Sequence, residues 1–321
     1  PPRSTLFPYT TLFRSEMMNF KTLCAYLWKL PLCGLAFFIG LAIGGMLLPM
    51  TGLQSPKIPE GTEANMVAMW FLMGSVILAF VLSFVAGNLQ AKLLIRWAIL
   101  AELIWIFAIV GMVIESYFFM TTGAVASLGD ALYTIMNFLL PALFLSLMLA
   151  LLFRPSQPLE PAMYYLRDYF KSYNPGMFGW RVLLALAAYP LVYITFGLIV
   201  QPFIQDFYIS GQFELAIPTW SQLIPLQLVR STFFLIFSLP VIIWWKGTQR
   251  GLWLSLGFSI FVLTAFMAVI TAYWFPWQLR FFHGLELLAD GLLYAAVLVT
   301  LFGTWQKFYL PNKVWFAGDK I

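Results

Sequence analysis

The chain has 321 residues, of which 62% are hydrophobic and 10% are charged, and its formal net charge is +5. Soluble domains carry roughly 25% charged residues, so this composition excludes an ordinary soluble protein and indicates an integral membrane protein. The Lys and Arg residues lie between apolar runs rather than in one dense patch, so nucleic acid is not expected as a partner.

Residues 1–15 fit no element of a membrane protein. The stretch PPRSTLFPYTTLFRS carries Arg3 and Arg14, shows no helical or strand period, and lacks the continuous apolar core of a secretory signal. Over its whole length it resembles the translation of a common short-read sequencing adapter. We therefore expect residues 1–15 to be non-native, with Met17 or Met18 as the natural start and 16–30 as a cytoplasmic flank.

Apolar runs of about 20 residues recur along the rest of the chain, and one helix of that length crosses the hydrocarbon layer of a bilayer. They predict an all-α fold, a polytopic membrane helix bundle of eight transmembrane helices over residues 31–303 with a cytoplasmic tail at 304–321. The expected spans are 31–50, 65–87, 97–115 with a continuation to 119, 131–153, 182–200, 223–245, 252–273 and 279–303.

The charges between these spans predict the orientation of the chain. Most Lys and Arg residues fall on one side of the eight spans, whereas Lys57 lies in a loop on the other side. The positive-inside rule makes the basic side cytoplasmic, so we expect both termini to be cytoplasmic in a bacterial-type cytoplasmic membrane. The basic side comprises Lys21, Lys29, Lys92, Arg96, Arg154, Arg167, Lys171, Arg181, Lys246, Arg250, Lys307, Lys313 and Lys320.

The spans divide into two halves that are candidates for an internal repeat. The halves cover about 31–153 and 180–303 and are joined by a cytoplasmic loop at 154–179. Lys29 and Gly45 have the same separation as Arg181 and Gly197. Four spans per half would give the halves the same orientation, as in a parallel repeat about an axis along the membrane normal. Chance recurrence of positive flanks is the alternative.

Four charged residues lie inside the expected spans: Glu102, Arg230, Glu286 and Asp290. Each such charge costs roughly 2.5–3.5 kcal/mol at a helix centre, so each needs a partner or a purpose. In the eighth span a helical period places one polar stripe on a single face, which must contact protein or water because lipid cannot satisfy it. The stripe consists of Arg280, His283, Glu286, Asp290 and Tyr294.

Arg230 and Glu286 lie about seven residues into their spans from the same side, which places both ~10 Å deep. We therefore expect Glu286 to be the first ion-pair partner of Arg230 and Asp290, one turn deeper, to be the second. The carboxyl left without a cation could then gain and lose a proton, as a proton-coupled device requires. Glu102 could continue such a relay towards the cytoplasm.

The leading hypothesis is a transporter-like protein that handles an unidentified small solute, ion or proton. Arg230, Glu286 and Asp290 would form its site, and His283 would lie at the outer entrance. One alternative is a non-catalytic membrane subunit or assembly factor, in which these charges only hold helices together. Another is an intramembrane lipid-modifying enzyme that uses His283 with Glu286. The sequence predicts no cofactor and no metal, and it leaves the oligomeric state open.

Overall fold

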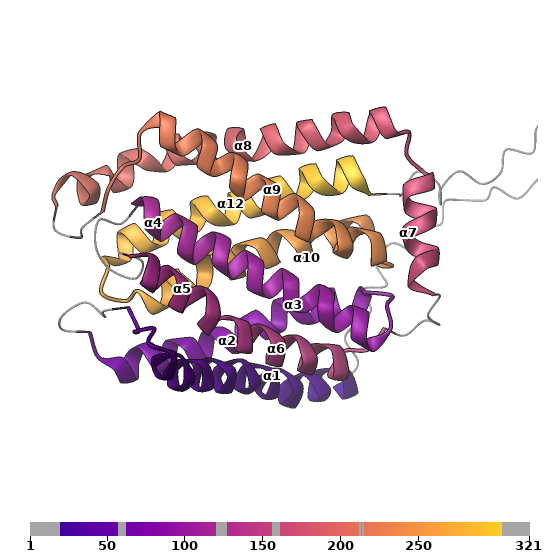
Figure 1. The fold of residues 1–321 in the computed structure, drawn as a ribbon, viewed down its shortest axis with the longest axis horizontal. Helices are drawn as coiled ribbons and strands as arrows, with labels where there is room; N and C mark the ends of the chain where they lie inside the picture. The colour runs from indigo at the N-terminus through magenta and orange to yellow at the C-terminus, as the bar shows by residue number, and fades with distance from the viewer. Residues whose placement is uncertain are drawn as a thin grey trace, which may run out of the picture.

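The computed structural model describes residues 20–56, 62–119, 127–155, 161–211, 213 and 215–303, so the expected non-native segment and the C-terminal tail lie outside the described residues. Within the described part, eight helical runs are long and apolar enough to cross a membrane, which confirms the all-α polytopic bundle (Figure 1). They are Cys24–Thr51, Ala64–Asn88, Leu93–Phe119, Leu128–Leu152, Pro175–Ile209, Trp220–Trp244, Gln249–Thr271 and Trp277–Phe302.

Some spans are single helices and others are built from consecutive segments. The first half contains α1 (Phe20–Leu47) with the 3-10 turn η2 (Leu48–Thr51), α2 (Ala64–Asn88), α3 (Leu93–Ile109) with the π-helix η3 (Val110–Ile114) and α4 (Glu115–Phe119), and α5 (Leu128–Asn137) with α6 (Leu139–Leu152). The second half contains α8 (Pro175–Ile209), α9 (Trp220–Trp244), α10 (Gln249–Phe261) with the π-helix η4 (Val262–Phe266) and α11 (Met267–Thr271), and α12 (Trp277–Phe302). The short helix α7 (Ala162–Lys171) connects the halves.

The two π-helices pack against each other where the halves meet. A Cβ atom at Gly111 would collide with the backbone of Thr264, so glycine is required for this close approach. A π-helix adds a residue to the turn and changes the direction of the side chains that follow. In the third span the residue that follows is Glu115.

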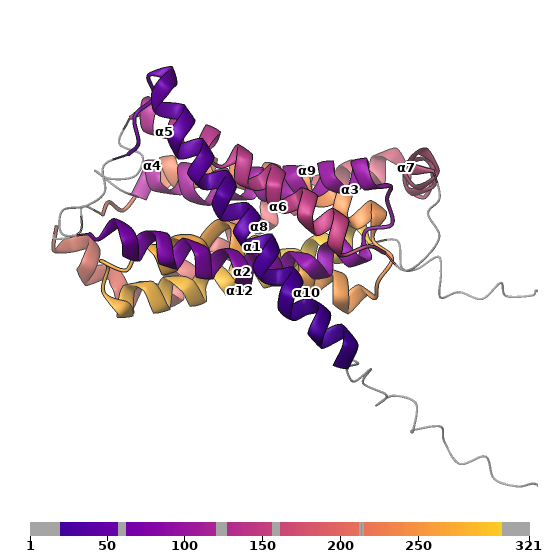
Figure 2. The same ribbon diagram turned by 90° about the horizontal axis from the view of Figure 1, so that it is seen from below.

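The helices of each half have the same neighbours. The first span packs against the second and the fourth, and the third packs against the fourth; the fifth, sixth, seventh and eighth spans repeat this pattern. Figure 2 shows α1 crossing the other spans obliquely. The halves meet where the second span contacts the seventh and the third contacts the sixth. Exchanging the halves leaves this pattern unchanged, as a twofold axis requires.

Three long-range hydrogen bonds of the first half recur in the second at matching positions. Lys29 Nζ donates to Leu152 O (2.9 Å), and at the matching position Arg181 Nη1 donates to Leu301 O (2.6 Å). Ser75 Oγ donates to Gly34 O (3.0 Å), and Ser231 Oγ donates to Leu186 O (3.0 Å). Trp97 Nε1 donates to Leu143 O (3.0 Å), and Trp253 Nε1 donates to Leu292 O (2.7 Å). Matched residues are 152 positions apart in the first and fifth spans, 156 in the second and sixth and in the third and seventh, and 149 in the fourth and eighth. These repeated contacts support a parallel repeat.

A reciprocal contact lies at the centre of this arrangement. Leu89, after the second span, and Trp245, after the sixth, form an isolated antiparallel bridge. Gln90 N donates to Trp244 O (2.9 Å), and Lys246 N donates to Asn88 O (3.1 Å). The two donors, Gln90 and Lys246, are 156 residues apart, and so are the two acceptors, Asn88 and Trp244. Each half therefore donates one of these bonds and accepts the other.

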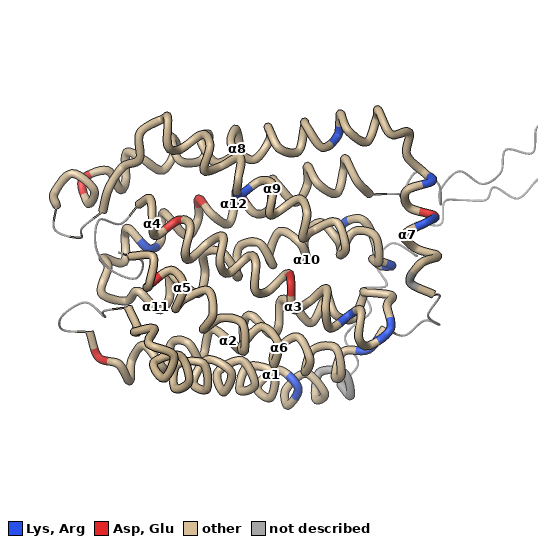
Figure 3. The backbone as a smooth tube through the Cα atoms, viewed as in Figure 1, with Lys and Arg blue, Asp and Glu red and all other residues tan. Residues whose placement is uncertain are grey.

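The Lys and Arg residues gather mainly at one end of the bundle, the end at which α7 lies (Figure 3). There Tyr169 Oη and Tyr173 Oη both donate to Phe302 O, at 3.0 and 2.8 Å. The carbonyl groups at the end of a helix have no partner within it, so these bonds tie the end of α12 to α7 and to the turn that follows α7. Burial raises the pKa of both phenols.

Candidate functional site

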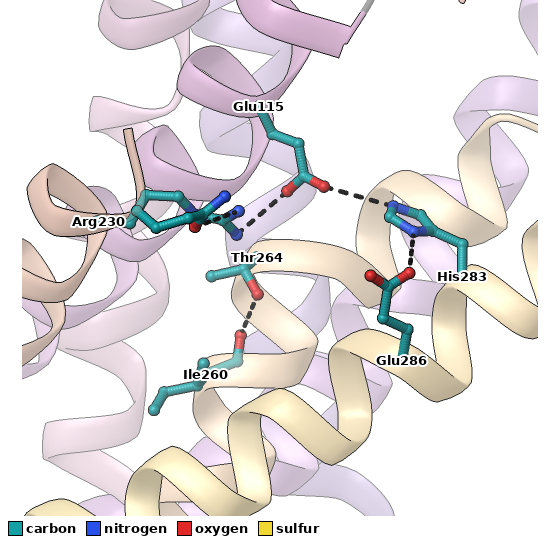
Figure 4. A network of polar contacts seen from close by, with 7 residues as sticks. Glu115, Arg230, Ile260, Thr264, His283 and Glu286 are labelled. Carbon is teal, nitrogen blue, oxygen red and sulfur yellow. Dashed lines mark hydrogen bonds and ion pairs between the residues drawn. The ribbon is translucent and has the colours of Figure 1, made fainter. Parts of the chain in front are cut away.

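The most deeply buried cation among the described residues is Arg230, whose side chain is 0% exposed in α9. Its Nη2 atom lies 3.2 Å from Oε2 of Glu115, the first residue of α4 (Figure 4). The expected pairing of Arg230 with Glu286 is therefore wrong. The third span lies beside the sixth, so its residues can reach Arg230. Glu115 directly follows the π-helix η3, and its carboxylate faces the guanidinium.

His283 continues the contact on the other side of Glu115. Its Nε2 atom lies 3.4 Å from Glu115 Oε1, and its Nδ1 atom lies 3.1 Å from Glu286 Oε2. Arg230, Glu115, His283 and Glu286 thus form one chain of contacts across the third, sixth and eighth spans (Figure 4). With His283 protonated, these four side chains carry no net charge. We call them the polar quartet.

Aromatic rings enclose the guanidinium of Arg230. Its Cζ atom lies 5.5 Å from the ring centre of Tyr189, 5.4 Å from that of Tyr193 and 6.0 Å from that of Phe234. A cation over an aromatic face is attracted by the negative potential of the ring. Gln227 adds an oxygen, Oε1, at 3.4 Å from Nη1. One carboxylate and these neutral groups are therefore the partners of the cation.

Asp290 lies one turn beyond Glu286 on α12 and is 1% exposed. Neither of its carboxyl oxygens has a hydrogen-bond partner among the described residues, so it is not the second partner of Arg230 that the sequence suggested. An ionised carboxylate without hydrogen bonds is costly in an apolar interior, so this side chain is suited to holding a proton. One turn further, Tyr294 Oη donates to Ser231 O at 3.2 Å.

Two other expected site residues lie apart from the polar quartet. Glu102 is exposed on α3 and makes no hydrogen bond or ion pair within the described chain, so a relay through it is not seen. Arg280 Nε donates to Phe275 O at 3.1 Å, which fixes the guanidinium near the start of α12.

Glu115 was not among the site residues expected from the sequence. It was expected where the third span passes into its continuation to Phe119, and the helical run does extend from Leu93 to Phe119 with this carboxylate inside it. A carboxylate inside an apolar run was therefore the available signal. Gln227, Tyr189 and Tyr193 gave no such signal, because neutral polar and aromatic residues are common in spans.

Two cavities adjoin the polar quartet. One, of about 300 Å³, is lined by residues of α8, the start of α9 and α12, including Glu286. The other, of about 400 Å³, is lined by Glu115 and Arg280 among others. His283, Phe119 and Tyr208 line both. His283 therefore bridges two carboxylates that face different cavities.

The repeat shows what occupies the matching positions in the other half. The spacings of the repeated hydrogen bonds give a counterpart for each member of the polar quartet and for Asp290. All five counterparts are uncharged. The counterparts are Gly74 for Arg230, Thr134 for His283, Asn137 for Glu286, Pro141 for Asp290 and Thr271 for Glu115. The same helix neighbours are present without these charges, so the packing of a half does not require them.

Within the described residues, no group of three or more His, Cys, Asp or Glu side chains is arranged to hold a metal ion. Comparison of the chain with protein-family models, with curated proteins and with solved structures finds no match.

Proposed function

We propose that this protein is a proton-coupled membrane transporter, with its basic end on the cytoplasmic side and its polar site in the outer half of the membrane. The observation that carries the proposal is the position of His283. One ring nitrogen contacts Glu115, which lines the larger cavity, and the other contacts Glu286, which lines the smaller one. An imidazole can accept a proton at one nitrogen and release one from the other.

Asp290 extends this pathway. It follows Glu286 by one turn on the same helix, and its carboxyl oxygens have no hydrogen-bond partner among the described residues. A buried carboxyl in a membrane span is a functional-site candidate because its burial is costly unless it is used. Arg230 would hold Glu115 ionised and in place, so that His283 has a fixed carboxylate on one side.

The repeat favours this function over a purely structural role for the charges. The first half keeps the helix neighbours of the second, yet it has Gly74 at the position of Arg230 and Asn137 at the position of Glu286. Charges that only held helices together would be expected in both halves. Their confinement to one site supports a role in chemistry or transport.

The test is proton movement into sealed vesicles that contain the purified protein and a trapped pH-sensitive dye, driven by a potassium diffusion potential. The wild-type protein should acidify the vesicle interior faster than empty vesicles do. His283→Ala and Glu286→Gln should reduce that rate at least about tenfold, since positioned proton carriers contribute factors of that size or more. Equal rates for the wild-type protein and both variants would contradict the proposal.

A second candidate function, a non-catalytic membrane subunit, is favoured by Glu102. This carboxylate is exposed on a membrane-spanning helix, where lipid cannot satisfy it. A helix of another protein that covered α3 could do so. A stoichiometric partner that remains with the wild-type protein and is lost from Glu102→Leu, together with no proton movement, would support this reading instead.

A further inference from the structure

The smaller cavity has the character of a ligand site. Its described lining includes the aromatic side chains of Phe119, Tyr193, Tyr208 and Trp220, with the amides of Gln201 and Gln205. Glu286 is its anionic group, and none of the described residues that line it is Lys or Arg. Its volume of about 300 Å³ is sufficient for a small organic molecule.

Apolar residues line this cavity at the surface of the bundle. Leu198 in α8 is 55% exposed, Trp220 at the start of α9 is 59% exposed, and Ile217 just before α9 is 62% exposed. Leu198 lies within a membrane span, so its exposed side chain lies against lipid rather than water, and it lines the cavity together with Ile217 and Trp220 at the start of the next span. A molecule with an apolar body can therefore reach the cavity sideways from the bilayer.

One carboxylate oxygen of Glu286 is left for a ligand. Oε2 is bonded to His283 Nδ1, whereas Oε1 has no hydrogen bond within the described chain. Oε1 faces Gly197 in α8, where an added Cβ atom would lie 3.2 Å from it. The absence of a side chain at Gly197 leaves space along α8 beside this oxygen.

We propose that this cavity binds a lipophilic organic cation, which enters from the membrane between α8 and α9 with its charge at Glu286 Oε1. The rings of Tyr193, Tyr208 and Trp220 add cation–π attraction, and Leu198 and Leu223 contact the apolar body. The bound cation balances the charge of Glu286 when the proton on His283 leaves. This exchange of a proton for the bound cation rests on the proposed function. The binding of the cation in the cavity does not.

The probe is tetraphenylphosphonium, with tetraphenylborate as a probe of the same shape and opposite charge. Equilibrium dialysis of the full chain in a nonionic detergent measures the binding of each. We expect saturable binding of the phosphonium cation at one site per chain. Glu286→Gln should weaken it at least about tenfold, because the cation loses its electrostatic attraction to the carboxylate in the described lining of the cavity.

The shape of the site is tested on α8. Gly197→Leu should abolish binding because the side chain fills the space beside Glu286 Oε1. Gly179→Leu is the matched control: it is the same change on the same helix, at a position with no atom within 4 Å of an added Cβ, and it should bind the cation as the wild-type protein does. If Gly197→Leu does not fold, Trp220→Ala tests the site at an exposed position, with an expected loss of about threefold.

No saturable binding of the cation, equal affinity for the borate anion, or unchanged affinity in Glu286→Gln would overturn the binding site. Cation binding that depends on Glu286 in a protein that moves no protons would retain the site and reject the transport proposal. Proton movement that depends on His283, without cation binding, would reject this site alone.

Discussion

Glu115 and Arg230 form an ion pair with 3.2 Å between Oε2 and Nη2, although 115 residues separate them in the chain. The pair links the two halves of the bundle, because Glu115 belongs to the third span and Arg230 to the sixth. It also holds the carboxylate that His283 contacts. Its energetics therefore bear on both the stability and the proposed chemistry of the protein.

A double-mutant cycle on this pair should show strong coupling. Removing one partner of a buried ion pair typically costs about 3–5 kcal/mol, because the other charge is left without its counterion. Glu115→Gln and Arg230→Met should therefore each lower the midpoint of thermal unfolding, and the double variant should lose much less than the sum of the two. Glu102→Gln removes an exposed carboxylate that has no partner among the described residues, and it should have little effect. Additive losses would show that the pair is not coupled.

Asp290→Asn should leave the fold intact while removing a proton carrier. The described protein makes no hydrogen bond to the Asp290 carboxyl oxygens, so the amide breaks none and the unfolding midpoint should be unchanged or raised. Proton movement into vesicles should fall. The infrared absorption of a protonated carboxyl group should also disappear from the spectrum. A large loss of stability with unchanged proton movement would assign Asp290 a structural role.

Gly111→Ala should destabilise the contact between the π-helices. The added Cβ atom would collide with the backbone of Thr264, and overpacking in a dense interior costs about 1–3 kcal/mol. Because Glu115 follows this π-helix, the variant should also weaken proton movement. Gly87→Ala in α2 is the control: its Cβ would meet no atom within 4 Å, so it should be neutral or stabilising. Equal midpoints for the two variants would argue against close packing at Gly111.

The contact of α7 with α12 should weaken at alkaline pH. Burial raises the pKa of Tyr169 above the value near 10 of an exposed phenol, so above that pH the unfolded chain loses a proton that the folded chain retains. The stability that this group contributes is fully present below about pH 10 and declines as the pH rises further. The difference in unfolding midpoint between the wild-type protein and Tyr169→Phe should therefore shrink above pH 10. Tyr164→Phe, at a side chain that is 58% exposed, should show no such trend.

The sequence alone determined the number and approximate position of the spans. Hydropathy is a local property, and a run of about 20 apolar residues has few alternatives to a helix across the bilayer. The largest difference is in the fifth span, expected at 182–200 and observed as the 35-residue helix Pro175–Ile209. Its ends carry polar and interfacial residues that a hydropathy window excludes. Of the residues whose separations match, Lys29 and Arg181 make corresponding hydrogen bonds to the ends of the fourth and eighth spans, whereas Gly45 and Gly197 face side chains that do not correspond.

The tertiary structure alone decided which charges meet. Arg230, Glu286 and Asp290 were recognisable because charges are rare in spans, and His283 because it is the single histidine. Depth in the membrane can be read from position along a helix, but the partner of Arg230 depends on which helix lies beside α9 and on how that helix is rotated. The third span lies there, and Glu115 follows its π-helix. Glu102, in the same span, is turned outwards instead. Helix rotation and neighbour choice arise from packing between distant segments, and no local pattern of residues encodes them.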